Sequence, residues 1–320
     1  MSTYVLRRLV YLVPVLLAVS LLAFGLGRLA PGDPARDLLA RTTGRQPSAR
    51  EVSVERHRLG LDRSLPFQYA DWVGHALRGD LGVSYTTGEP VGRAVGETLP
   101  LTLELAGAAL FLSIALGIPL GILAAALRWS WVDHLVRLFA LLAAAIPAFW
   151  LGYLLILAFA VHLHLLPAFG TGGLSHLILP AFTLALFDIA ILARLTRAAL
   201  LETLGEDYIR TAFAKGASEP LVLIRHALPP TLIPLLTWIG MNFGFLLGYS
   251  VVVETVFSWP GLGYSTVLAI RARDYPFVQA FVLLMALVFV GLNLVVDLLY
   301  TRLDPRVRFG PLGTIGAGGA

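Results

Sequence analysis

The stretch Arg210-Thr-Ala-Phe-Ala-Lys-Gly216, followed by Leu228-Pro229, lies in a polar break between two strongly apolar segments. Glu206-Asp207 come just before it, and Arg210 and Lys215 come later. Acidic residues at the start of a helix and basic residues toward its end suit the helix dipole. The order of charges therefore predicts a short helix that begins at about Asp207.

A sharp corner is expected after this helix. Gly216 stands at the position where a helix ends in a left-handed residue, a conformation that glycine adopts without strain. Ser218-Glu-Pro220 then resembles the N-cap and first turn of a second helix that runs to about Leu228. We expect Pro229-Pro230 to stop that helix. The sequence predicts helix, glycine corner and helix, and an ordinary interfacial helical loop remains the alternative on these signals alone.

The chain as a whole is strongly apolar. Of its 320 residues, 57% are hydrophobic and 14% are charged, and the mean hydropathy is +0.78. Soluble domains carry about 25% charged residues. The net charge of +4 comes from scattered basic residues, which argues against a nucleic-acid interface. The sequence has no cysteine, so disulfide and thiolate chemistry are excluded.

Hydropathy predicts an all-α integral membrane protein with six membrane-spanning helices. The first span follows Arg7-Arg8 and is longer than the apolar core of a signal peptide, so we expect it to be retained. The predicted spans are 9–29, 101–127, 138–161, 177–195, 232–256 and 278–300.

The basic residues of the short loops set the expected orientation. Such residues stay in the cytoplasm, and an inward N-terminus places most of them inside, while the outer loop 162–176 contains no Lys or Arg. Both termini are therefore expected in the cytoplasm. The segment 31–98 would then face outward.

Local signals predict that this outer segment is folded. They are the turns Pro31-Gly-Asp-Pro34 and Gly79-Asp-Leu-Gly82 and two short amphipathic helices at 51–59 and 66–77. An outer segment of this kind often meets a ligand or partner. A solvated cap without a partner is the alternative.

Small residues and prolines mark the packing of the spans. Gly117-x-x-x-Gly121 puts two glycines on one helix face, and Gly240, Gly244 and Gly248 do the same, which favours close helix approach. Prolines at the following positions tend to kink their helices. They are Pro14, Pro119, Pro147, Pro180 and Pro234.

Few polar residues fall within the spans. They are Glu104, Asp188, Asn242, Asn293, Asp297 and Glu254. Asp188 lies nearest the middle of a span, and a buried ionisable group there is a functional candidate. A carboxyl group that is protonated or hydrogen-bonded to a neighbouring helix is the alternative. Asp297 and Glu254 lie near span ends, and we expect both to reach the interface.

Familiar catalytic motifs are missing from the sequence. It contains no G-x-x-x-x-G-K-[ST], so this chain has no P-loop for ATP, and neither H-E-x-x-H nor G-x-S-x-G occurs. His162, His164 and His176 suggest a metal site, but their spacing fits no established ligand pattern. We expect no metal site and no catalytic residue in this chain.

The polar stretch resembles the EAA motif of ABC-transporter permeases, E-A-A-x3-G-x9-I-x-L-P. Gly216 and Leu228-Pro229 match that pattern, whereas Arg210, Thr211 and His226 depart from it. The Arg-Thr-Ala form resembles the dipeptide/oligopeptide/nickel branch of the family. Further stretches agree with that branch, so that the resemblance covers almost the whole chain. They are Leu29-Ala-Pro-Gly-Asp-Pro34, Leu59-Gly-Leu-Asp62, Gly79-Asp-Leu-Gly82, Ile146-Pro-Ala-Phe-Trp150, Arg194-Leu-Thr-Arg197, Trp259-Pro-Gly-Leu-Gly263 and Leu303-Asp-Pro-Arg306.

The resemblance implies the type I permease fold of ABC importers and a B-type subunit that pairs with a C-type permease. Two cytoplasmic ATPase subunits would use ATP and Mg, and an extracytoplasmic binding protein would deliver a di- or oligopeptide. This chain would bind no cofactor itself. The residues expected to contact an ATPase subunit are Asp207, Tyr208, Arg210, Thr211, Ala212, Lys215, Gly216, Leu228 and Pro229. Asp188 is the candidate for lining the path.

The expected organisation is a first helix at 1–30, an outer segment at 31–98, a five-helix core at 99–309 with the coupling loop 203–230, and a disordered tail at 310–320. The location would be the cytoplasmic membrane of a bacterium or archaeon. Import of nickel or another small solute by the same machinery is the alternative for the cargo. An ion-coupled transporter working alone would show inverted repeats and paired midplane charges, and a membrane enzyme would show a clustered nucleophile or metal set; the sequence shows none of these.

Overall fold

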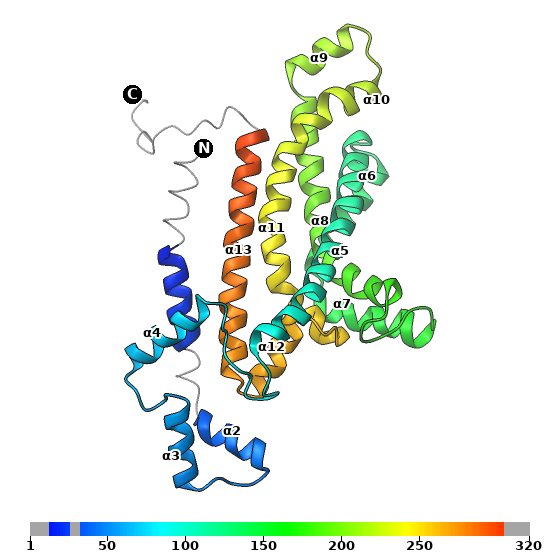
Figure 1. Ribbon diagram of the computed structural model, residues 1–320. Coiled ribbons are helices and arrows are strands. Elements are labelled where there is room, and N and C mark those ends of the chain that lie inside the picture. The colour runs from blue at the N-terminus through cyan, green and yellow to red at the C-terminus, as the bar shows by residue number, and fades with distance from the viewer. Residues whose placement is uncertain (1–12, 26–32, 304–320) are drawn as a thin grey trace.

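The computed structural model describes residues 13–25 and 33–303. Within these ranges the chain is helical apart from its loops and one isolated bridge between Val83 and Pro90. Figure 1 shows long helices side by side, short helices gathered at one end and a helix pair projecting from the other. The all-α prediction is thus confirmed for the described part. Arg7-Arg8, Leu29 to Gly32 and the tail 310–320 lie outside the described residues.

Four helices are long and apolar enough to cross a membrane. They are α5 (Val91–Ala126), α8 (Leu174–Leu204), the continuous helix Glu219–Phe257 that contains α11 (Leu228–Phe257), and α13 (Tyr275–Leu303), whose apolar part is Tyr275–Leu292. These helices correspond to four of the predicted spans. The described part of the first predicted span is a shorter apolar helix, Val13–Gly25.

The third predicted span, 138–161, is broken in the middle. Its residues form α6 (Trp131–Ala145) and a second helix made of α7 (Ala148–Leu155) and the π-helical η1 (Ile156–His162), and the two are bent by 104°. Ile146 is extended, with φ −82° and ψ 121°, because the ring of Pro147 disfavours the helical conformation in the residue before it. The predicted kink at Pro147 is therefore confirmed, and it is a complete break between two helices. With the bent pair counted as one span, the number of candidate spans is five.

Helices α5 and α8 pack closely along the predicted glycine face. A Cβ atom on Gly117 would lie 2.7 Å from Leu192 Cβ, and one on Gly121 would lie 2.5 Å from Thr196 Cβ. Such distances leave no room for a side chain, so the backbones approach as closely as the glycine spacing predicts. This contact belongs to the centre of the core, where α8 is the most buried of the candidate spans.

Glu254 does not reach the interface. Its side chain is fully buried in α11 and accepts hydrogen bonds from Thr102 Oγ1 (2.8 Å), Ser250 Oγ (3.0 Å) and Tyr264 N (2.8 Å). The chain folds back over it after Phe257, so that α12 (Leu262–Arg271) begins beside the carboxylate. The prediction for Glu254 is wrong because that return loop was not foreseen. The Asp297 side chain lies outside the described residues.

The segment between the first helix and α5 is folded. It contains α2 (Pro34–Thr43), α3 (Ala49–Arg58) and α4 (Leu65–Ala76), of which the last two match the predicted helices. A capping box between Ser48 and Glu51 starts α3. Gly79 and Gly82 both have positive φ, as the predicted turn requires.

Asp274 ties the end of this segment to the core. The loop before α13 holds the buried Asp274 carboxylate, which accepts hydrogen bonds from Ser84 Oγ, Tyr85 N (3.0 Å) and Thr86 N (3.2 Å). A carboxylate with several donors stays fixed in place. The loop that leads into α5 is therefore anchored nearly two hundred residues away along the chain.

Candidate functional site

A compact helix pair lies beyond the ends of the long helices α8 and α11. It consists of α9 (Asp207–Ala214), α10 (Glu219–Leu221) and the π-helical turn η2 (Val222–Ala227), and Figure 1 shows it at the end of the molecule opposite α2 and α3. Glu206 is the N-cap residue of α9, and the charge of Asp207 lies in the first turn, where it favours the helix dipole. The predicted helix start is confirmed.

Gly216 forms the predicted corner. Its φ is +84°, its N–H donates to the carbonyl of Phe213 at 2.9 Å, and the N–H of Ala217 donates to that of Ala212 at 3.2 Å. These bonds close the C-terminal end of α9. A Cβ atom on Gly216 would meet nothing within 4 Å. The backbone conformation, and not a lack of space, therefore demands glycine here.

Helix α9 is attached to the core through one face. Ile209 is fully buried among Ala125, Leu200 and Val222, with Ala212 packed against the same cluster. Tyr208 Oη donates to the carbonyl of His226 at 3.3 Å, which joins α9 to η2 across the corner. Partial burial raises the pKa of the Tyr208 hydroxyl, so the group stays neutral and donates.

The opposite face of α9 is open to solvent. Arg210, Thr211 and Lys215 are exposed, and the only ion pair of Arg210 within the described residues is with Asp207 of the same helix, at 3.3 Å. Phe213 also exposes 44% of its surface. Helix α9 thus has one face packed on the core and a charged and aromatic face in solvent. Such an exposed face is suited to contact another protein.

Pro229 and Pro230 do not end the second helix. They lie in the first turn of α11, where a missing N–H is tolerated, and the wider π-helical turn η2 precedes them. The chain is helical without a break from Glu219 to Phe257. The prediction of a stop is therefore wrong. As a consequence, the helix pair is joined rigidly to a membrane-spanning helix.

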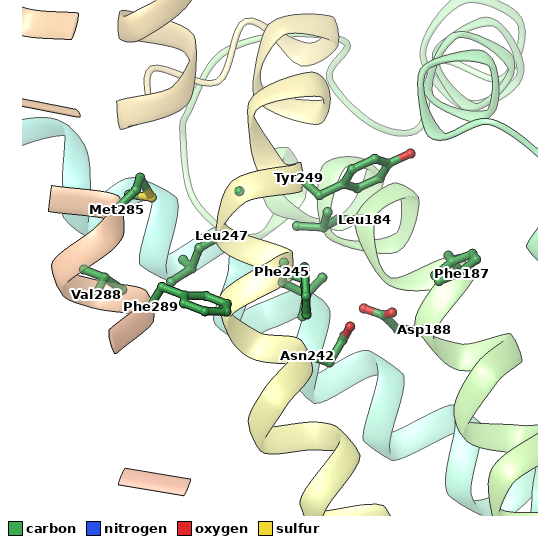
Figure 2. A pocket seen from close by; sticks show the side chains of 13 residues that line it. Leu184, Phe187, Asp188, Asn242, Phe245, Leu247, Tyr249, Met285, Val288 and Phe289 are labelled. Carbon is green, nitrogen blue, oxygen red and sulfur yellow. The ribbon is translucent and has the colours of Figure 1, made fainter. Parts of the chain in front are cut away.

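A cavity of about 710 Å³ lies between α8, α11 and α13. Most of its lining is apolar or aromatic, and Figure 2 shows Asp188 of α8 and Asn242 of α11 pointing toward one another at its edge. Asp188 is only 3% exposed. The Nδ2 atom of Asn242 is buried and has no hydrogen-bond partner in the part of the chain that the structure describes. The cavity thus offers one carboxyl group and one amide group, which face and interact with one another, within an apolar wall.

The structure gathers the predicted coupling residues at one end of the molecule. Those at 207–216 belong to α9 and its corner, and Leu228-Pro229 start α11 directly after η2. Asp188 is separate from them and lines the cavity on α8. Sequence reasoning missed Ile209 as the anchor of α9. The available signal was a single β-branched apolar residue within a polar stretch.

The three histidines at the end of η1, after it and at the start of α8 do not assemble into a metal site. Among residues 13–25 and 33–303, no group of three or more His, Cys, Asp or Glu side chains could hold a metal ion. His162, His164 and His176 therefore give no structural support to a metal cargo.

Comparison with known proteins identifies relatives along nearly the whole chain. Residues 117–309 match the family described as "Binding-protein-dependent transport system inner membrane component", and residues 1–106 match its N-terminal family. The glutathione transport system permease protein GsiC of Escherichia coli O6:H1 (strain CFT073) is 43% identical over 309 residues, which cover 97% of this chain and 100% of that protein. GsiC of Salmonella typhimurium (strain LT2) is also 43% identical, with the same coverage.

The fold is similar to that of a solved transporter. An inward-facing structure of the MetNI methionine ABC transporter superposes with a TM-score of 0.57 over 66% of this chain and 96% of that chain, at 19% identity. A second crystal form of the same transporter gives a TM-score of 0.55. At this identity the likeness concerns the fold alone.

Proposed function

The chain belongs to the family of binding-protein-dependent transport system inner membrane components, and from this premise we propose that it is the B-type permease of an ATP-driven importer of short peptides. It is a permease subunit of an ABC transporter in the inner membrane. Relatives that align over 97% of this chain and over their own whole length are named glutathione transport system permease protein. Glutathione is itself a short peptide. A peptide cargo is therefore favoured over nickel.

The helix pair is the proposed point where energy enters. The observation that most supports this is the orientation of α9. The helix exposes Arg210, Thr211 and Lys215, while its buried residue Ile209 packs against the ends of the long helices. The sequence has no P-loop, so hydrolysis of ATP with Mg belongs to two partner ATPase subunits. In the proposal, Asp207, Tyr208 and Ala212 complete the docked helix, and closure of the ATPases moves it.

The movement would pass into the membrane through the second helix. Gly216 fixes the angle between α9 and α10, and Leu228-Pro229 continue η2 into α11 without a break. Since α11 also lines the cavity beside α8 and α13, a shift of the helix pair changes the walls of that cavity. This geometry supports a mechanical link between partner ATPases and path.

Asp188 is the proposed polar contact for the cargo. A peptide carries a protonated amine, which a carboxyl group recognises, and a backbone carbonyl, which the Asn242 amide could meet. The apolar remainder of the wall would contact side chains of any shape. Most specificity would then reside in the extracytoplasmic binding protein, with this chain and a C-type permease each forming half of the path.

We place both termini in the cytoplasm, with six spans: 9–29, the bent pair and the four long helices. The proposed domains are a first helix at 1–30, an outer segment at 31–98, a core at 99–309 with the coupling loop 203–230, and a tail at 310–320. The basic short loops support this orientation. It leaves the helix pair on the ATP side, and the folded segment α2 to α4 on the side of the binding protein.

Transport by the purified assembly in liposomes tests the proposal. With ATP inside and the binding protein outside, we expect uptake of a labelled dipeptide or glutathione and none of nickel ions. Gly216→Trp would force a bulky residue into a left-handed conformation. We expect this variant to insert in the membrane normally and to lose uptake.

Two results would contradict the proposal. Normal uptake by a correctly inserted Gly216→Trp variant would rule out the coupling role of the corner. Nickel uptake without peptide uptake would show that the cargo is nickel and not a peptide. Gly107→Trp is a suitable control, because Gly107 has ordinary helical geometry and open space around it; it should retain uptake.

A further inference from the structure

A basic pocket of about 510 Å³ lies between α6 and α8. Its α6 side is formed by His134, Arg137, Leu138 and Leu141, which are spaced as one helix face, and its α8 side by Arg194 and Arg197. Figure 1 shows α6 in the half of the molecule that carries α9. The pocket therefore lies away from the outer helices α2 and α3, and it is separate from the cavity at Asp188.

One arginine of this pocket is already paired. Arg197 binds the fully buried carboxylate of Asp133 through two hydrogen bonds of 2.6 and 2.7 Å. The same carboxylate accepts a hydrogen bond from Trp129 N at 3.1 Å, which holds the turn between α5 and α6. Asp133 thus fixes both the pocket wall and the turn beside it, and its negative charge is fully engaged.

The other two arginines keep their charge free. Arg137 acts electrostatically on Asp133, yet neither Arg137 nor Arg194 forms a hydrogen bond or ion pair with any residue that the structure describes. The Nδ1 atom of His134 donates to the carbonyl of Ser130 at 2.7 Å, which leaves the other ring nitrogen available. The pocket therefore has an excess of hydrogen-bond donors and of positive charge, which favours binding of an anion.

The surroundings of the pocket indicate that this anion is attached to an apolar chain. Leu138 and Leu141 continue the α6 face along the membrane-spanning direction, and both are exposed. Trp129 and Trp131, at the start of α6, expose 77% and 73% of their surfaces. Exposed tryptophans are typical of the headgroup level of a bilayer. A free phosphate ion would make no use of this apolar and aromatic border.

We propose that the pocket between α6 and α8 binds an anionic phospholipid, with its phosphate between Arg137 and Arg194 and an acyl chain along Leu138 and Leu141. Basic pockets between membrane helices bind lipid headgroups by this combination of charge and apolar contact. The bound lipid would join the end of α8, which continues toward the helix pair, to the bilayer. On the orientation given under the proposed function, this lipid belongs to the cytoplasmic leaflet. The leaflet is the one part of the inference that rests on the proposed function.

Lipid binding to the purified transporter, containing the full-length chain, tests this site. Native mass spectrometry compares phosphatidylglycerol with phosphatidylcholine at equal lipid concentration. We expect tighter binding of phosphatidylglycerol, and at least roughly tenfold weaker binding in an Arg137→Gln/Arg194→Gln variant, since each basic residue contributes about 1 kcal/mol. Binding of phosphatidylcholine should stay unchanged.

A matched control has the same loss of charge elsewhere. Arg128→Gln/Arg225→Gln removes two exposed arginines that do not line the pocket, and it should retain phosphatidylglycerol binding. Equal weakening in this control would overturn the site in favour of general charge attraction. Displacement of the lipid by millimolar inorganic phosphate would show that the site takes the free ion. Equal binding of both lipids would also refute the proposal.

A second measurement does not depend on the variants. Phosphatidylglycerol with brominated acyl chains should quench tryptophan fluorescence of the unmodified transporter more strongly than the corresponding phosphatidylcholine. Trp129→Phe/Trp131→Phe should remove most of that difference, because these two exposed tryptophans lie at the start of α6. No difference between the lipids would contradict the site even if the arginine variants fail to fold. Neither measurement requires transport, so the result stands apart from the proposed cargo.

Discussion

Glu254 and Asp188 are two carboxyl groups buried within the predicted spans, and their surroundings differ completely. Glu254 accepts three hydrogen bonds, two from hydroxyls and one from a backbone N–H, and is enclosed by the loop that leads into α12. Asp188 lies at the edge of a large cavity, with the side chain of Asn242 pointing toward it.

The difference separates a structural carboxylate from a functional candidate. Burying a charged group is costly unless hydrogen bonds surround it. At Glu254 three helices, α5, α11 and α12, provide these bonds. At Asp188 the fold leaves space beside the group, and only the Asn242 amide faces it. A polar pair beside a cavity has room to receive a ligand, whereas a carboxylate that is enclosed by its donors serves to hold the fold together.

The largest effect is expected from Glu254→Ala. The change would leave Thr102 Oγ1 and Tyr264 N without their acceptor, whereas the Ser250 hydroxyl could still donate to the carbonyl of Leu247 at 2.9 Å; each unsatisfied buried donor costs about 1–3 kcal/mol. The sum is a large part of the stability of a typical domain. We expect little folded protein in the membrane, measured by monodisperse yield and thermal unfolding of the purified transporter.

Two comparisons sharpen this prediction. Glu254→Gln keeps one acceptor oxygen and should lose clearly less stability. Glu202→Ala removes an exposed carboxylate from α8 and should change stability little. Normal yield and unfolding temperature of Glu254→Ala would show that the network does not hold α12 in place.

A smaller loss is expected when the enclosure itself is disturbed. A Cβ atom on Gly261 would lie 2.5 Å from Glu254 Oε2 and 2.6 Å from Thr102 Oγ1. Gly261→Val should therefore separate the loop from the carboxylate, and overpacking of this kind typically costs about 1–3 kcal/mol. The measurement is the same thermal unfolding experiment. Gly248→Val on α11, where a Cβ would meet nothing within 4 Å, is the control.

Sequence reasoning could predict the helices but not this enclosure. The apolar runs, the glycine faces and the start of α9 follow from local periodicity and capping, so they were predictable. Ser250 lies one helical turn before Glu254, but the other two donors lie about 150 residues before it and ten after it, and no local pattern encodes the meeting of these three groups. The same limit explains Pro229-Pro230, which end a helix by local rules but continue one here after a π-helical turn.

The candidate site was predictable only in part. Asp188 stood out because it is an acid near the middle of an apolar run. That Asn242 faces it, and that a cavity lies beside both, depends on the packing of α8 against α11. The bend at Pro147 was foreseeable as a kink, but its size of 104° depends on tertiary contacts.

Asp188→Asn tests the functional side of the comparison. The variant keeps the size of the side chain but loses the charge that would meet a peptide amine. A hydrogen bond to a charged group is worth about 1.5–3 kcal/mol, so we expect peptide uptake to fall roughly tenfold or more. Because an isolated buried charge does not favour folding, the unfolding temperature should stay equal or rise.

This outcome differs in kind from that at Glu254, where stability is lost first. A matched control is Asp37→Asn in helix α2, which removes a carboxylate that pairs with Arg273 outside the cavity; uptake should be retained. If Asp188→Asn changes neither uptake nor stimulation of the ATPase, Asp188 is not part of the path. If it unfolds the protein, Asp188 belongs with Glu254 as a structural group.

The smallest effect is expected at Glu51, whose carboxylate is open to solvent, in contrast to the buried carboxyl groups of Glu254 and Asp188. A hydrogen bond from Arg45 and further ones from Ser48 lower its pKa from 4.5 to about 2. Because the pKa is lower in the folded state, the contribution to stability is complete above pH 4.5 and is lost as the pH falls toward 2.

Hydrogen exchange of the amides of α3, corrected for intrinsic rates, should show weaker protection at pH 3 than at pH 6. Since Glu51 is surrounded by water, the loss should stay within α3, and Glu51→Gln should make protection there independent of pH. Equal protection of the unmodified protein at both pH values would show that the ionised Glu51 carboxylate of the capping box does not stabilise α3.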